Sequence, residues 1–474
     1  MRGIVSFAAY LPYRRLDRTQ IAPFVGQGGG KGTRTVASYD EDSTTMAVEA
    51  GRLALRAQPG KAGVVPTQLL FGTSFPAYAD KTNATAVHSA LRLPADSLAL
   101  DLGASVRSAV GGLLLALEGS GTSLVVSADV RTGLPGSGEE SSGGDAAAAL
   151  LVGDDAGSGG AGPVVAEFVG RASVTDEFIE RWRVPGEVRT KTWDEKFSEI
   201  SLVPLGVRAW NQALETAGLT ANDVQAAAVS APLARVAKSM GGKLDGVHVI
   251  DDHAATVGNT GAAQPALLLS ALLEQAAPGQ VVALVVLADG ADVLLFRATD
   301  ALGSYRSART IAEQVAAGGP LPYGKFLAWR GMLQVEPPRR PEPGRISAVV
   351  AARNEDWKFG FVGSQEPETG VIHMPPARVS RDGLHTDEMA PAPLADVQGT
   401  VVTFTIDRMA YSPSPPIVFA VVDFDGGGRL PVELTDLDAS EAAIGQRVEM
   451  TFRKLFTADG IVNYFWKGRL VRNG

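Results

Sequence analysis

The first 300 residues carry short, nearly continuous apolar runs that are separated by polar and glycine-rich segments. Runs of about four to eight apolar residues between turn residues are typical of strands buried on both faces. They predict strands at residues 4–11, 69–74, 97–102, 123–129, 143–152, 224–230, 247–250, 280–287 and 288–296. Longer segments predict helices at residues 83–91, 205–217 and 265–273. Strands that alternate with helices indicate a mostly parallel sheet with crossover helices.

A further helix is expected after residue 42, where polar residues precede an apolar stripe. Ser43 or Thr44 supplies the short hydroxyl side chain that commonly caps the first turn of a helix. Met46, Ala50 and Leu53 then lie on one face, which has the spacing of a buried stripe.

The end of the chain follows a different pattern, in which apolar and polar residues alternate in places. Five strand-like runs are separated by Gly, Pro and Asp, at residues 400–408, 417–425, 429–434, 447–455 and 463–470. Five antiparallel strands of this kind are typical of an all-β OB-fold barrel. Before them, residues 321–331 predict a short helix, and the proline-rich residues 337–343 predict an extended, semi-rigid linker.

Length and charge limit the classes of function. A chain of 474 residues is long enough for two or three domains, and 45% hydrophobic residues indicate a globular protein. The formal net charge of -9 argues against nucleic acid as a partner, even though OB folds often bind single strands. No apolar stretch is long enough to cross a membrane, and the first residues lack the features of a signal peptide. We therefore expect a cytoplasmic protein that binds no membrane.

The chain contains no cysteine and only five histidines. Disulfides, thiolate metal sites and cysteine nucleophiles are therefore impossible within this chain. The histidines form no pair four residues apart and no HExxH motif, so we expect no metal site built from histidine.

Residues 100–117 are the centre of the pattern, because a strand-like run stops there at small residues and an apolar helical run begins. This stretch resembles the nucleophile elbow of the thiolase superfamily, most closely that of 3-hydroxy-3-methylglutaryl-CoA synthases and type III ketoacyl synthases. In that elbow a cysteine sits at a helix N-terminus, where the helix dipole lowers the pKa of its thiol. Val106 stands at the matching position, and a valine side chain cannot act as a nucleophile.

The resemblance extends over residues 1 to about 300. Residues 143–152 resemble the Gly-Asp-Gly-Ala segment that the superfamily places beside its active site, and residues 181–197 resemble an insertion of the family. The resemblance implies a duplicated, five-layered αβαβα thiolase-like fold. Its predicted halves are residues 1–165 and 166–300, followed by a linker with a short helix at residues 301–345.

The resemblance also implies a catalytic set of Cys, His and Glu, and none of the three residues is present. Val106 replaces the cysteine. Ser230, in Ser-Ala-Pro, stands where the family has histidine, and Ser74, followed by Phe75, falls where the family has glutamate.

A few polar residues remain as candidates near these positions. Asn259 matches the asparagine that type III ketoacyl synthases use to stabilise an oxyanion, but it is equally interpretable as a left-handed turn residue. His253 either approaches the same pocket or is a solvated loop residue. Ser105 and Ser108 flank Val106, and a serine without a neighbouring base is a poor nucleophile.

Other residues carry weaker functional hypotheses. Three basic residues are candidates for binding the phosphates of CoA: Arg107, Arg235 and Lys238. Some thiolase-like proteins use tyrosine for retro-aldol cleavage, but no pattern marks one of Tyr323, Tyr411 or Tyr464 for that task. Glu139 and Glu140 lie in a Ser/Gly-rich segment that is typical of a solvated face.

The C-terminal region resembles an acyl-CoA-associated OB-fold family that carries a rubredoxin-like zinc ribbon before its barrel. The matching segments are residues 359–364, 370–376 and 399–404. At the four cysteine positions of the ribbon this chain has Glu366, Thr369, Ser380 and Gly383. Without thiolates we expect no zinc. Residues 346–398 are thus predicted as a degenerate ribbon-like segment and residues 399–474 as the OB-fold domain.

Three hypotheses for function follow. The first is an acyl-CoA-binding pseudo-enzyme, a homodimer that serves as accessory or scaffold subunit for a separate, cysteine-bearing thiolase-like protein. The second is an enzyme that forms or cleaves C–C bonds of acyl-CoA through Asn259, His253 and backbone donors, without a covalent intermediate. In the third, the OB-fold domain performs the function and the first 300 residues provide a dimerisation platform.

Overall fold

The computed structural model describes residues 1–57, 64–155, 162–381 and 383–472. The thiolase-like part is built on one ten-stranded sheet with the order β12-β11-β13-β14-β8-β1-β7-β6-β4-β5. The first half contributes β1 (Arg2–Tyr10), β4 (Gln68–Thr73), β5 (Leu98–Gly103), β6 (Ser123–Asp129) and β7 (Ala146–Asp154). The second contributes β8 (Ala166–Val174), β11 (Val224–Ser230), β12 (His248–Val249), β13 (Val281–Leu287) and β14 (Ala291–Ala298).

The strand order confirms the internal duplication. The order β1-β7-β6-β4-β5 in the first half is repeated as β8-β14-β13-β11-β12 in the second, and the halves join where Ile4 pairs with Ala166. The prediction of a mostly parallel sheet is confirmed within each half, because β1 runs in the same direction as β4, β5 and β6, and β8 in the same direction as β11, β12 and β13. The strands β7 and β14 return antiparallel beside β6 and β13, so each half is a mixed sheet.

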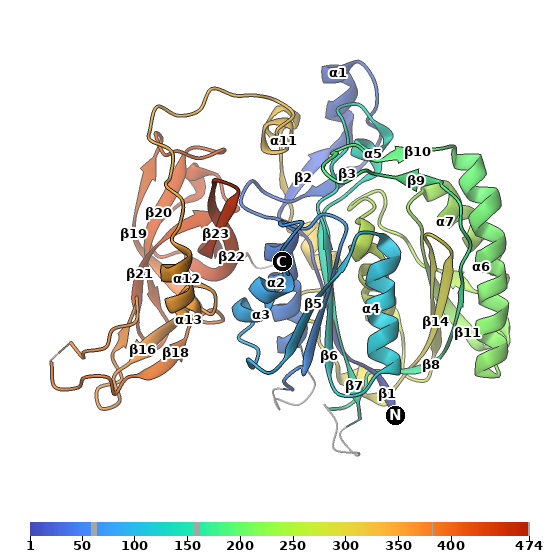
Figure 1. The fold of residues 1–474 in the computed structure, drawn as a ribbon, viewed down its shortest axis with the longest axis horizontal. Coiled ribbons are helices and arrows are strands. Elements are labelled where there is room, and N and C mark those ends of the chain that lie inside the picture. The colour runs from blue at the N-terminus through green and yellow to red at the C-terminus, as the bar shows by residue number, and fades with distance from the viewer. Residues whose placement is uncertain (58–63, 156–161, 382, 473–474) are drawn as a thin grey trace.

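Helices complete the five layers (Figure 1). The helices α4 (Val106–Glu118) and α8 (Gln264–Gln275) contact each other and both halves of the sheet, with an apolar core around them. The outer layers hold α2 (Ser43–Arg56) and α3 (Ala84–Ala90) on one side and α6 (Glu195–Ala217) and α7 (Ala234–Gly241) on the other. The thiolase-like prediction is thereby confirmed.

Two helices begin differently from the prediction. The first turn of α2 is capped by Asp42, whose carboxylate accepts the backbone N–H of Thr45 at 2.9 Å. The helix α6 begins ten residues before the predicted start, because the carboxylate of Asp194 accepts the N–H of Phe197 at 2.9 Å and Pro204 is accommodated inside the helix. In both cases an aspartate is the capping acceptor.

Shorter elements lie mainly at the carboxyl ends of the strands and in the linker. They are β2 (Arg14–Asp17), η1 (Arg18–Gln20), α1 (Ile21–Val25), β3 (Thr33–Val36), α5 (Gly138–Ser142), β9 (Arg181–Trp182), β10 (Lys191–Thr192), η3 (Ala221–Asp223), η4 (Gly261–Ala263), α9 (Asp300–Ser304), α10 (Ile311–Ala316), β15 (Gly319–Pro320) and α11 (Tyr323–Trp329). Within the described parts of the chain, no helix is both long and apolar enough to span a membrane.

The C-terminal part contains a small sheet and a closed barrel. The small sheet, with the order β17-β16-β18, and two short helices precede the barrel: α12 (Ala348–Arg353), α13 (Glu355–Lys358), β16 (Val362–Gln365), β17 (Ile372–His373) and β18 (Ala390–Pro393). The barrel, with the order β19-β20-β21-β23-β22, consists of β19 (Gly399–Asp407), β20 (Ile417–Phe424), β21 (Arg429–Thr435), η5 (Ala439–Glu441), β22 (Arg447–Ala458) and β23 (Ile461–Leu470). Five strands closed in this way confirm the OB-fold prediction.

Hydrogen bonds order each of the two loops that would hold zinc in the resembled ribbon, and one histidine–glutamate contact connects the loops. The buried carboxylate of Glu366 accepts the N–H of Thr369 at 3.0 Å, and the hydroxyl of Ser380 accepts the N–H of His385 at 3.0 Å. Nε2 of His385 lies 3.4 Å from Glu366, which connects the loops. These residues do not fit a thiolate zinc site. Among the described residues no group of three or more His, Asp or Glu side chains is placed to hold a metal ion.

The barrel is joined to the first half of the thiolase-like part through buried charges. Arg453 of β22 is fully buried, and its guanidinium lies 3.2 Å from Asp40, 3.1 Å from Glu41 and 2.6 Å from Asp436. Asp40 and Glu41 lie just before α2, which the barrel contacts (Figure 1). The ion pairs therefore connect residues that are more than 400 positions apart, and the two parts form one packed unit.

Candidate functional site

The elbow lies at one edge of the first half of the sheet. Because β4, β5 and β6 run parallel, their carboxyl ends meet there, with Thr73 opposite Gly103. Ser105 has an extended backbone, and Val106 is the first residue of α4. A Cβ added to Gly72 would lie 2.8 Å from the Cβ of Ala109, so glycine permits α4 to pack directly on β4. A valine thus stands at the start of a helix, where the first turn leaves backbone N–H groups without partners inside the helix.

Asp129, which ends β6, is the central polar residue of this edge. Its fully buried carboxylate accepts the N–H and the hydroxyl of Ser74, both at 2.7 Å, and the N–H of Ala262 at 2.7 Å. Thr73 donates a further hydrogen bond at 3.1 Å. Ser74 therefore holds the carboxylate of Asp129 in place, and it does not take the role of the glutamate that the resembled family has at this position. Our sequence analysis missed this role of Asp129, although an acidic residue that ends an apolar strand was an available signal.

The backbone of Asn259 connects the two halves at the same edge, where its N–H donates to the carbonyl of Ser142 at 2.8 Å. Its side-chain amide donates to the carbonyl of Ala231 at 2.8 Å, directly after the buried Ser230, and its Oδ1 accepts the N–H of Gly261 at 3.0 Å. The interpretation as a left-handed turn residue was wrong, since the left-handed residue of this loop is Gly258, with φ of 92°. The amide of Asn259 hence holds the backbone that presents Ala262 to Asp129.

His253 is a turn residue. Its φ of 57° is left-handed, and its carbonyl accepts the N–H groups of Val257 at 2.8 Å and Gly258 at 3.1 Å. The imidazole Nδ1 lies 3.8 Å from the carboxylate of Asp251. His253 therefore shapes the loop before Asn259.

The hydroxyls beside Val106 serve the elbow itself. Ser108 donates to the carbonyl of Gly103 at 2.7 Å, and the hydroxyl oxygens of Ser105 and Ser108 lie 3.4 Å apart. These contacts supply neither of the two serines with a base.

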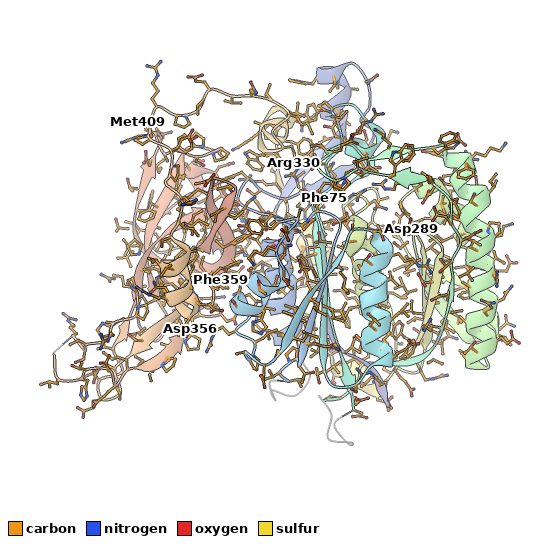
Figure 2. All side chains as sticks on the ribbon, viewed as in Figure 1. Phe75, Asp289, Arg330, Asp356, Phe359 and Met409 are labelled. Carbon is orange, nitrogen blue, oxygen red and sulfur yellow. The ribbon has the colours of Figure 1, made fainter. Side chains whose placement is uncertain are left out.

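The basic residues predicted to bind CoA differ in their surroundings. Arg107 donates to Asp292 at 3.0 Å and to the carbonyl of Asp289, which is labelled in Figure 2, so its guanidinium joins the two halves. Arg235, on the exposed face of α7, lies 2.5 Å from Glu199 of α6, and Lys238 is also exposed on α7. Their assignment to CoA stays a prediction.

A group of arginines that the sequence analysis did not identify lies over the strand ends. Arg181 contacts Glu139 through two hydrogen bonds of 2.9 and 3.0 Å, and Arg131 pairs with the same carboxylate. Burial raises the pKa of Glu139, but the guanidinium groups of Arg131 and Arg181 outweigh it and hold the pKa at about 2. The expectation of a solvated face for this segment was wrong, because ion pairing holds Glu139 in the fold.

The neighbouring Glu140 is fully buried, and its carboxylate is the hydrogen-bond partner of Tyr323, one of the candidate tyrosines. The hydroxyl of Tyr323 donates to the carboxylate of Glu140 at 2.9 Å, and burial raises the pKa of that carboxyl. Tyr464 donates to Asp42 at 2.8 Å and Tyr411 to Glu342 at 3.0 Å. Each hydroxyl thus has a structural partner.

Comparisons with known proteins agree with this geometry. The chain is 27% identical over 356 residues to the hydroxymethylglutaryl-CoA synthase of Archaeoglobus fulgidus, covering 70% of this chain and 98% of that protein. It is 26% identical over 357 residues to the synthase of Methanosphaera stadtmanae, covering 71% and 100%. Residues 392–453 match the family described as the ChsH2 C-terminal OB-fold domain. The chain is a hydroxymethylglutaryl-CoA synthase-like protein with a C-terminal OB-fold domain.

Solved structures share the fold of this synthase-like part. A hydroxymethylglutaryl-CoA synthase complexed with CoA superimposes with a TM-score of 0.57 at 16% identity, covering 69% of this chain and 89% of that one. The 3-oxoacyl-(acyl carrier protein) synthase III of Pseudomonas aeruginosa gives 0.53 at 20% identity, covering 63% and 98%. At these identities the structures establish the thiolase-like fold.

Proposed function

We propose that the chain binds acyl-CoA without acylation and serves in the cytoplasm as an accessory subunit of a separate thiolase-type condensing or cleaving enzyme. One observation carries this proposal: Val106 occupies the start of α4, where a thiolate nucleophile would have its pKa lowered. The chain has no cysteine to replace it. The serines at positions 74 and 230 are buried and cannot perform the acid and base chemistry of Glu and His.

CoA as ligand is supported by the relatives. The curated relatives are synthases of a CoA ester, and one structural neighbour holds CoA. The OB-fold domain supports the second part of the proposal, because it belongs to a family that we associate with acyl-CoA proteins. A partner with its own cysteine would supply the covalent step, while this chain would hold the thioester.

Binding and acylation are separable in one experiment. Purified protein is mixed with radiolabelled acetyl-CoA or acetoacetyl-CoA, and binding is measured by equilibrium dialysis. Acid precipitation then shows whether label is covalently attached. We expect saturable binding and no acid-stable label. Purification of the tagged protein from its source cell, with mass spectrometry, is expected to return a stoichiometric, cysteine-bearing thiolase-like protein.

The competing hypothesis is a non-covalent enzyme that uses Asn259 and His253. It predicts C–C bond formation or cleavage by the isolated chain, with loss of turnover in Asn259→Ala and His253→Ala. Turnover by the isolated wild-type protein would overturn the accessory role. Turnover that survives both substitutions would refute the assignment of these two residues as well.

A homodimer through β5 is part of the proposal. The strand β5 ends the sheet, and Leu98 and Leu100 on one of its faces are 50% and 43% exposed. An apolar sheet edge of this kind favours association with a second copy.

Leu100→Asp is expected to raise the dimer dissociation constant by about tenfold or more, since it places a charge on the exposed apolar surface that the proposed contact would bury. Size-exclusion chromatography with light scattering measures the change. The control Ile444→Asp alters an apolar residue on the barrel that is 67% exposed, and it should leave the mass unchanged. A monomeric wild-type protein, or equal masses for both variants, would contradict an interface at β5.

A further inference from the structure

A small cavity lies where the thiolase-like part, the linker and the barrel meet. It has a volume of about 60 Å³, and its walls include residues of β2, of the linker helix α11, of the start of β20 and of the end of β21. In Figure 1, α11 lies between β2 and the barrel, and Arg330, labelled in Figure 2, directly follows this helix. One water molecule needs roughly 10–15 Å³ of such a cavity, so the space corresponds to about four or five non-hydrogen atoms.

Three residues that line the cavity each have a buried polar atom without a hydrogen-bond partner. These atoms are Nε of Arg14, Nε1 of Trp329 and Oδ1 of Asp436. Arg14 and Asp436 are only 8% and 5% exposed, so solvent does not supply the missing partners. A buried polar group that stays unpaired destabilises the fold. Two donors and one acceptor around one cavity therefore indicate an occupant that accepts at least two hydrogen bonds and donates one.

The two charged residues of this set have their other polar atoms occupied. Oδ2 of Asp436 accepts a hydrogen bond from the buried Arg453 at 2.6 Å, which leaves Oδ1 as a fixed, free acceptor. The Nη atoms of Arg14 donate to the carbonyls of Pro320 and Leu437 at 3.4 and 3.3 Å. These contacts orient both side chains, so neither can turn its unpaired atom toward another partner without losing a bond.

The charges around the cavity include one ammonium group without an ion pair. The charged residues that line the cavity are Arg14, Lys325, Asp436 and Asp438. Asp436 pairs with Arg453, and Asp438, whose side chain is 71% exposed, lies 3.7 Å from Arg14. Within the described parts of the chain, Lys325 forms no ion pair, and its Nζ lies 5.3 Å from the centre of the Trp329 ring.

The surroundings of Lys325 disfavour its charge. Burial lowers the pKa of its ammonium group and the charge of Arg14 lowers it further, while Asp438 opposes both from beyond ion-pair distance. An anion in the cavity would face this group directly. The occupant is therefore expected to carry a negative charge as well as one proton that it can donate.

We propose that this cavity binds a small oxyanion that carries a proton, either hydrogenphosphate or hydrogencarbonate. Its oxygens accept hydrogen bonds from Nε1–H of Trp329 and Nε–H of Arg14, and its O–H group donates to Oδ1 of Asp436. These ions have five and four non-hydrogen atoms, which is what the space admits. The bound ion connects β2, α11 and the barrel. None of these residues belongs to the elbow, so the site is independent of the proposed function.

The indole N–H signals of the full chain, labelled with [15N]tryptophan, report binding by NMR. The chain has six tryptophans, and Trp329→Phe and Trp193→Phe identify two of the six signals. We expect the Trp329 proton signal to move downfield, saturably, when phosphate or hydrogencarbonate is added, because a hydrogen bond to an anion deshields the proton. Trp193 is 71% exposed and serves as the internal control, whose signal should not move.

Anions of matched shape test the acceptor Asp436. Sulfate has the shape of phosphate and nitrate that of hydrogencarbonate, but neither carries a proton at pH 7.5. Both should bind about tenfold more weakly, or worse, at equal ionic strength. Glycerol 3-phosphate exceeds the space and should not move the signal. Lys325→Met should weaken phosphate binding about tenfold, whereas Lys243→Met, at an exposed lysine of the second half, should leave it unchanged.

Four results would each overturn the proposal. A Trp329 signal that moves with none of the anions means that water alone fills the cavity. Equal affinity for the proton-bearing anions and their matched partners removes the role of Asp436. Binding of glycerol 3-phosphate as tightly as phosphate assigns the site to a phosphate group of a larger molecule. Unchanged phosphate affinity in Lys325→Met places the anion elsewhere.

Discussion

Arg453→Met is expected to lower the free energy of unfolding by about 3–5 kcal/mol, because it removes one partner of a fully buried charge cluster. The guanidinium lies within 3.2 Å of Asp40, Glu41 and Asp436, which belong to both parts of the molecule. Methionine fills most of the volume but leaves these carboxylates without their shared cation. Urea unfolding followed by circular dichroism measures the change.

The pH dependence of this loss has a defined sign. Burial already raises the pKa of Glu41 to about 7, and removal of Arg453 raises the pKa of the buried carboxyls further. When a carboxyl has a higher pKa in the folded protein than in the unfolded chain, the unfolded chain releases the proton at lower pH. The protein therefore loses stability as the pH rises from the unfolded pKa to the folded pKa. The destabilisation by Arg453→Met should therefore be larger at pH 8 than at pH 5.

Arg429→Met is the matched control on the same barrel. Arg429 pairs with Asp423 at 2.5 Å, but the two side chains are 62% and 43% exposed. Exposed pairs contribute about 0–1 kcal/mol, so this variant should unfold nearly as the wild type does. Equal destabilisation by the two substitutions would contradict a special role for the buried cluster.

Val106→Cys is expected to create a reactive thiol at the start of α4. The helix N-terminus favours the thiolate, so alkylation by iodoacetamide at pH 6.5 should be about tenfold faster than for an ordinary exposed thiol. The wild-type chain has no cysteine, so each variant reports a single thiol. Because Ser74 and Ser230 remain, we expect no condensing activity in this variant.

The reference is Leu115→Cys, on the last turns of the same helix. Leu115 is 62% exposed and lies near the end where the helix dipole disfavours a thiolate. Rates are compared over pH 5.5–9 by mass spectrometry. A Val106→Cys thiol that reacts no faster than the Leu115→Cys thiol at pH 6.5 would show that the elbow no longer activates a nucleophile.

The local pattern of apolar and polar residues predicted much of the fold. The continuous apolar runs predicted the strands of the ten-stranded sheet except β8, which is only partly buried, and the alternating runs after residue 399 predicted a barrel that the structure closes. These features depend on neighbours within one element, so they can be derived from periodicity. The direction of β7 and β14 could not be derived in this way, because an apolar run indicates that a strand is buried but not whether it runs parallel or antiparallel to its neighbour.

The sequence by itself determined the two kinds of domain, the elbow and the absence of a nucleophile at Val106. The tertiary structure alone decided how the polar residues are used: Asp129 collects donors from both halves, Glu139 pairs with a hairpin 42 positions away, and Arg183 covers Phe75. A buried charge is stable only when paired, and its partner comes from whichever segment folding brings near. The separation of two residues in the sequence does not indicate whether folding brings them together. The hydrogen-bond and ion-pair partners in the site are therefore known only from the three-dimensional structure.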